Sequence, residues 1–209
     1  MLGTYMQPRL KPAYKLGGKF AYRRRMRPVH LSLAGFITAL LTFVFLGNGI
    51  YGFALLGIFL NRYIHGVQQV LLAAYDIKDE APTFKKQYSI FIEQILNHTF
   101  YIGCLLFVSL GQDGMIGLGA FMITCYSIHA ASNFFYEHLE REYKETQASG
   151  SIRRPLISLV DGTETVGILA LMCLIAPLYP ALAGLFSIAC LVSVISKILE
   201  LRLLNKLDN

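Results

Sequence analysis

The chain has 209 residues, of which 55% are hydrophobic and 15% charged, and its mean hydropathy is +0.50. An ordinary soluble domain carries less apolar surface, so this composition predicts side chains that face lipid. The net charge of +6 would also suit a nucleic-acid binder, but anionic lipid headgroups explain basic residues beside apolar stretches better. We therefore expect an integral membrane protein that binds no nucleic acid.

The first 28 residues form a basic segment ahead of the first apolar stretch. They contain Lys and Arg but neither Asp nor Glu, and Tyr, Leu and Phe are interspersed. A short helix on the cytoplasmic membrane surface and a disordered basic tail both fit this pattern. No small-residue cleavage site follows, so we expect the first span to be retained. We expect a juxtamembrane segment at residues 1–28 and one membrane domain at residues 29–209.

Six apolar stretches follow, each near or above the roughly 20 residues that cross a hydrocarbon core of about 30 Å. Lipid does not tolerate unpaired backbone groups, and the alternating pattern of a barrel is absent, so each stretch predicts a helix. The expected fold is an all-α membrane protein with six transmembrane helices. The expected spans are residues 31–47, 50–73, 88–110, 114–136, 156–177 and 180–203.

The connections between these stretches differ in charge. Three are short, contain Gly or Pro, and lack Lys and Arg: residues 47–49, 111–114 and 177–180. The longer connections, residues 74–87 and 137–154, carry basic residues. Because Lys and Arg accumulate on the cytoplasmic side, the short turns are expected outside and both termini in the cytoplasm.

The four cysteines all fall within expected spans and show neither CxxC nor Cys/His ligand spacing. We interpret them as small apolar packing residues, and we predict no metal site among them. They are Cys104, Cys125, Cys173 and Cys190.

Two expected spans carry polar residues at helical spacing. An ionisable group inside a span costs roughly 2.5–3.5 kcal/mol, so each such group needs a reason. The span at residues 50–73 contains Arg62, His65, Gln68 and Gln69, most of them on one helical face. The span at residues 88–110 contains Glu93 and Asn97 at a similar depth. We predict that these stripes face each other across a polar cleft; hydrogen bonding between helices is the alternative.

A third polar group opens the fifth expected span. Asp161 and Glu164 are three residues apart on one helical face, and Glu164 would lie roughly 13 Å inside the span by helical rise. We predict that Arg62, Asp161 and Glu164 bind substrate, with interhelical hydrogen bonding again the alternative. For His129 in the fourth span, we favour an interhelical hydrogen bond over a ligand role.

Three segments resemble the CDP-alcohol phosphatidyltransferase family, and the likeness covers about residues 28–200. They are residues 28–35 (PVHLSLAG), residues 61–67 (NRYIHGV) and residues 161–165 (DGTET), the last similar to a segment of some bacterial members. The family consists of six-helix membrane enzymes that transfer a phosphatidyl or similar group from a CDP-linked donor to an alcohol. The resemblance implies that fold, phospholipid synthesis and a bacterial inner-membrane location.

The family signature has four aspartates that hold a divalent metal, and the last of them is the implied general base. At the matching positions this chain carries other residues: His65 and Gln68, then Gln69 for the glycine, then Glu93 and Asn97. The spacer at residues 74–88 is also longer than the family's. Mg²⁺ prefers charged oxygen ligands, and an amide such as Asn97 cannot accept a proton, so we assign no catalytic residue.

We therefore expect the family's fold with the metal-dependent reaction lost and lipid or partner binding retained. A working transferase with a rebuilt site, using Mg²⁺ or Mn²⁺ and charge from Asp161 or Glu164, is the first alternative. The second is a transporter whose polar stripes line a passage for a small solute or lipid. The expected partners are membrane lipid, a CDP-linked lipid and, from the resemblance, a second copy of the chain.

Overall fold

The computed structural model describes residues 2–76, 83–112, 114–146, 160 and 162–207, and within them the chain is helical without strands. The prediction of an all-helical fold is therefore confirmed. The helices are α1 (Leu2–Arg23), α2 (Pro28–Gly47), α3 (Tyr51–Asp76), α4 (Thr83–Leu110), α5 (Ile116–Thr146), α6 (Gly162–Leu174), the short 3₁₀ helix η1 (Ala176–Leu178) and α7 (Tyr179–Leu207).

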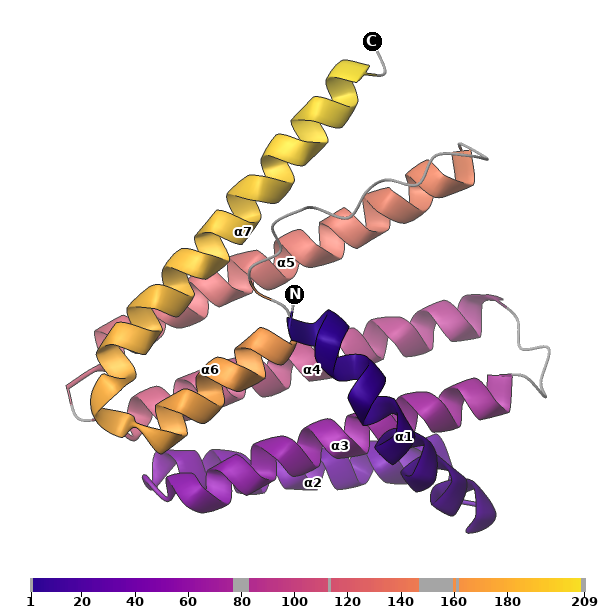
Figure 1. Ribbon diagram of the computed structural model, residues 1–209, viewed down its shortest axis with the longest axis horizontal. Coiled ribbons are helices and arrows are strands. Elements are labelled where there is room, and N and C mark those ends of the chain that lie inside the picture. The colour runs from indigo at the N-terminus through magenta and orange to yellow at the C-terminus, as the bar shows by residue number, and fades with distance from the viewer. Residues whose placement is uncertain (1, 77–82, 113, 147–159, 161, 208–209) are drawn as a thin grey trace.

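Short connections join α2 to α3, α4 to α5, and α6 to α7, and all three lie at the same end of the bundle, at the left in Figure 1. Gly49 and Gly114 adopt positive φ angles of 71° and 73° there. Glycine has no Cβ and takes up this conformation without strain, which allows the chain to reverse within a few residues. This end of the molecule is called the turn end below.

The fifth expected span, residues 156–177, lies only in part within the described residues, because residues 156–159 and 161 fall outside them. Helix α6 has only 13 residues, and Val160 before it is buried but not helical. At about 1.5 Å per residue, α6 is roughly 20 Å long, which is less than a hydrocarbon core of about 30 Å. Glu164 therefore lies in the first turn of α6 and not deep inside a long helix. Gly162 at the start of α6 favours this break, since glycine is a poor helix former.

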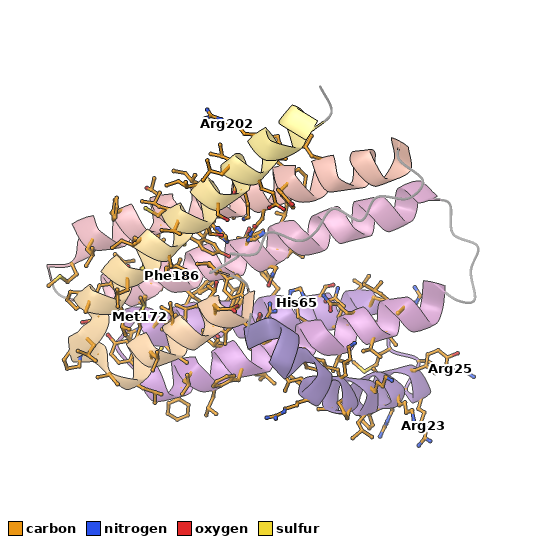
Figure 2. All side chains as sticks on the ribbon, turned by 45° about the horizontal axis from the view of Figure 1, so that its top comes forward. Arg23, Arg25, His65, Met172, Phe186 and Arg202 are labelled. Carbon is orange, nitrogen blue, oxygen red and sulfur yellow. The ribbon has the colours of Figure 1, made fainter. Side chains whose placement is uncertain are left out.

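The helices pack around one apolar core. Helix α2 packs against α3 and α4, α5 against α4 and α7, and α6 against α3, α4 and α7. Close approach of α2 and α3 depends on Gly57, because a Cβ there would lie 2.3 Å from Oγ1 of Thr42. Large side chains from six helices fill the centre: Leu46, Ile58, Leu105, Met122, Leu169 and Phe186. Figure 2 shows Phe186 and Met172 in the part of the bundle nearer the turn end.

Many large apolar side chains are exposed on the outer faces of the bundle. Helices α2, α3, α5 and α7 contribute most of them, including Leu33, Phe36, Leu40, Phe53, Leu56, Phe59, Phe121, Phe135, Leu185, Ile188 and Ile195. A soluble monomer rarely exposes an apolar patch above a few hundred Å². Two helical segments, Pro28–Gly47 and Ala176–Arg202, are also long and apolar enough to cross a membrane.

The basic N-terminal segment folds as helix α1, so the helical interpretation of this segment is correct and the tail interpretation is wrong. The helix packs against α3 and α6 and runs obliquely across α3 in Figure 1. Ala21 shares a small buried cluster with Leu31, Val67 and Leu71. Helix α1 is therefore anchored to the bundle by its own apolar contacts.

Candidate functional site

Arg62 of α3 is the centre of a polar cluster between three helices. Its guanidinium donates a hydrogen bond to Oδ1 of Asn97 on α4 and lies 5.4 Å from the centroid of the Tyr101 ring. The Tyr101 hydroxyl in turn donates to the carbonyl of Gly162, at the start of α6, at 3.1 Å. Arg62 and Asn97 thus face each other across α3 and α4, as the spacing of the two stripes predicted.

The position of Arg62 favours an anionic ligand. The side chain is half-buried, and its guanidinium has five N–H donors, one of which donates to Asn97. A Cβ on Gly162 would lie only 3.7 Å from Nη2 of Arg62, so the guanidinium lies close to the first residue of α6. The N-terminus of a helix carries a partial positive charge. Two sources of positive potential therefore meet at this point, and the Glu164 carboxylate in the first turn of α6 offsets part of that potential.

Gln68 lies on a different face of α3 from the one expected. Its amide donates to Oγ of Ser32 on α2 at 3.0 Å, and the side chain is only 9% exposed. Asn61, seven residues earlier, donates to the carbonyl of Gly35 on α2 at 2.8 Å. The i,i+7 pair forms a stripe toward α2, whereas Arg62 points toward α4. The expectation that Gln68 lines the cleft is therefore wrong.

The remaining predicted site residues are placed differently. His65 is half-buried on α3, near the middle of the molecule in Figure 2. Gln69 is exposed. The side chain of Glu93 and all of Asp161 lie outside the described residues. The structure therefore brings together Arg62 and Asn97 of the predicted set.

A second polar cluster, between α5 and α7, includes a lysine whose burial sequence reasoning missed. Lys197 is only 4% exposed, and its ammonium donates to Oδ1 of Asn133 and to Oγ of Ser132, the latter at 3.4 Å. His129 contacts the Asn133 amide at 3.1 Å through Nε2 and also interacts with the backbone of Val160. The sequence did indicate this burial, because Lys197 lies inside the last expected span, residues 180–203.

The cluster continues from α5 to α4. Nδ1 of His98 lies 3.1 Å from the hydroxyl of Tyr126 on α5, and the Tyr126 ring lies 6.4 Å from that of His129. His129 is 2% exposed. The hydrogen bond between the His129 and Asn133 side chains therefore lies within α5, whereas His98 and Lys197 join that helix to its neighbours.

The residues at the positions of the family's metal-binding aspartates do not fit the divalent metal that the resemblance implies. Gln68 is bound to Ser32, and Asn97 is bound to a guanidinium, which would repel a metal cation at that point. Among the described residues, no group of three or more His, Cys, Asp or Glu side chains is arranged to hold a metal ion. The side chains in contact with Arg62 are the Asn97 amide and the Tyr101 phenol, which suit hydrogen bonding better than binding of Mg²⁺.

The cysteines add no chemistry to either cluster. All four are reduced and buried, which agrees with their interpretation as apolar packing residues. Cys104 and Cys190 are fully buried within the main core.

Comparisons with protein-family models, with curated proteins and with solved structures found no match to this chain. The family resemblance accordingly rests on the segments at residues 28–35, 61–67 and 161–165.

Proposed function

We propose that this chain is a multi-pass membrane protein with the fold of the CDP-alcohol phosphatidyltransferases, in which metal-dependent transfer has been lost. In its place, Arg62 binds the phosphate group of a membrane lipid or of a CDP-linked lipid. The observation that carries this proposal is the hydrogen bond from the Arg62 guanidinium to Asn97. Asn97 occupies a position that matches a metal-binding aspartate of the family.

Membrane insertion is supported by the outer surface of the bundle. The exposed apolar side chains of α2, α3 and α7 would be covered by acyl chains, which removes them from water. The three short turns cluster at one end, and their sequences contain no Lys or Arg. The basic residues lie elsewhere, which favours turns outside and both termini in the cytoplasm.

Phosphate binding is supported by the chemistry of Arg62. A planar guanidinium can bind two phosphate oxygens at once, and it keeps its charge in a partly buried site. Asn97 and the Tyr101 ring orient the guanidinium, and the N-terminus of α6 lies beside it. The arginine would neutralise phosphate charge that a metal ion neutralises in the family's enzymes, without activating a nucleophile.

The first test is binding and turnover by the purified protein in lipid nanodiscs. We expect no release of CMP from CDP-diacylglycerol with Mg²⁺, Mn²⁺ or EDTA. We expect native mass spectrometry to detect bound phosphatidylglycerol or CDP-diacylglycerol, with retention reduced about tenfold by Arg62→Gln. The control is Arg202→Gln, which removes an exposed arginine near the end of α7 and should leave retention unchanged.

Turnover that requires metal and is abolished by Glu93→Gln would reject this proposal in favour of a transferase with a rebuilt site. Retention that responds equally to Arg62→Gln and Arg202→Gln would mean that lipid binds by general attraction to positive charge. Uptake of a solute into vesicles by the intact protein would favour the transporter alternative.

A further inference from the structure

Helix α1 presents three different faces, and one of them is fixed on the bundle. The ring of Tyr14 lies where a Cβ on Gly66 would be, within 2.6–2.7 Å of that position. On α1 itself, Gly17 lies against Tyr63 and Val67, with ideal Cβ contacts of 2.6 Å. Ala21 is also buried. These small residues allow α1 to approach α3 closely, which sets the rotation of α1 about its own axis.

Because the rotation is fixed, the two remaining flanks have defined positions. At about 100° per residue, the apolar flank and the basic flank lie about 120° apart, and each lies a similar angle from the face on α3. The apolar flank carries Leu16 and Phe20, which are 69% and 60% exposed. The basic flank carries Lys11, Lys15 and Lys19, all exposed. The apolar flank therefore favours an apolar environment, and the basic flank favours water or anionic groups.

We infer that α1 binds the surface of an anionic membrane, with its apolar flank among the acyl chains and its basic flank at the headgroups. This inference rests on the membrane insertion proposed above. Charge complementarity identifies the occupant, because residues 1–28 contain no acidic residue and anionic headgroups attract Lys and Arg. Leu16 and Phe20 supply the shallow apolar insertion that interfacial helices use.

The end of α1 has the same character. Arg24 lies over the Phe20 ring at 5.5 Å, and Figure 2 shows Arg23 and Arg25 at the far end of the helix. Long basic side chains next to an apolar flank can reach headgroups while their stems remain in apolar surroundings. A soluble acidic partner would satisfy the lysines but would leave the apolar flank in water.

The chain contains no tryptophan, so a single introduced tryptophan reports on one position by its fluorescence. Three single variants of the full-length protein are reconstituted in vesicles with brominated acyl chains. Phe20→Trp probes the apolar flank, and Lys15→Trp probes the basic flank of the same helix. Phe36→Trp probes an exposed position on α2 and reports membrane insertion itself.

We expect phosphatidylglycerol with brominated chains to quench Phe20→Trp and Phe36→Trp by at least about twofold. Lys15→Trp should instead be quenched by acrylamide in the aqueous phase. In mixed vesicles, brominated phosphatidylglycerol should quench Phe20→Trp more strongly than brominated phosphatidylcholine, by about twofold. Adding Lys11→Gln and Lys19→Gln should remove this preference.

Quenching of Phe36→Trp without quenching of Phe20→Trp would overturn the inference and leave membrane insertion intact. If neither is quenched, membrane insertion fails as well. If the emission of Phe20→Trp shifts with protein concentration and is not quenched by brominated lipid, the apolar flank contacts a second copy of the chain. Equal quenching by the two brominated lipids would remove the headgroup preference.

Discussion

The turn end and the interior of the bundle are held together by different interactions. At the turn end the hydrogen bonds join neutral groups, as between the hydroxyls of Ser109 and Tyr179 at 2.7 Å. The Tyr51 hydroxyl donates to the carbonyl of Gly111 at 3.1 Å and accepts from Gln112 at 2.7 Å. These bonds link α4 to α7 and α3 to the connection after α4. They stabilise the hairpins without burying a charge.

Farther from the turn end, two of the polar contacts between helices involve cations. Arg62 and Lys197 each donate to the amide oxygen of an asparagine on another helix, Asn97 and Asn133. Burying a cation has a large desolvation cost that an amide only partly offsets. Neutral bonds would stabilise this region at lower cost, so the cations point to a role other than stability.

The largest effect is expected where a buried cation loses one of its acceptors. Asn133→Leu removes one acceptor of Lys197, leaves Oγ of Ser132 in place, and should lower the free energy of unfolding by about 3 kcal/mol. Lys197→Met removes the charge itself and should change stability by about 1 kcal/mol or less. Reversible unfolding in mixed micelles measures both. Similar losses in the two variants would contradict the view that the poorly solvated charge of Lys197 dominates the effect.

A smaller loss is expected where α1 crosses α3. Gly66→Ala places a methyl group within 2.7 Å of the Tyr14 ring and should lower stability by about 1–3 kcal/mol as α1 shifts away. Hydrogen exchange over residues 2–23 should then become faster. Gly52→Ala in the same helix is the matched control, since a Cβ there meets nothing within 4 Å. Alanine favours a helix more than glycine does, so this control should not be destabilised.

The smallest effect is expected at the turn end. Tyr179→Phe removes the hydroxyl that meets Ser109, whose own hydroxyl still donates to the carbonyl of Leu105 at 2.6 Å. No buried donor is left unpaired by this change, so the loss should be about 1 kcal/mol. The melting temperature in detergent measures it, with Thr124→Val at an exposed hydroxyl as the control. A loss as large as that of Asn133→Leu would erase the contrast between the two regions.

Sequence patterns predicted the parts of this structure that depend on neighbouring residues. Apolar stretches predicted helices, and the Gly-containing segments near Gly49 and Gly114 predicted the reversals of the chain. Helical spacing also placed Arg62 opposite Asn97. It did not separate Gln68 from that stripe, because residues on adjacent faces of one helix differ by only part of a turn.

The length of α6, the direction of Gln68 and the burial of Lys197 were decided by tertiary packing. Helix α6 begins at Gly162, where it meets Tyr101 and Arg62. Lys197 resembles a terminal charge in the sequence, yet Ser132 and Asn133 on α5 offer its ammonium two acceptors. By itself the sequence determined which segments are helical and apolar, because those properties are local. Only the tertiary structure decided which polar side chains meet, because their partners lie on other helices.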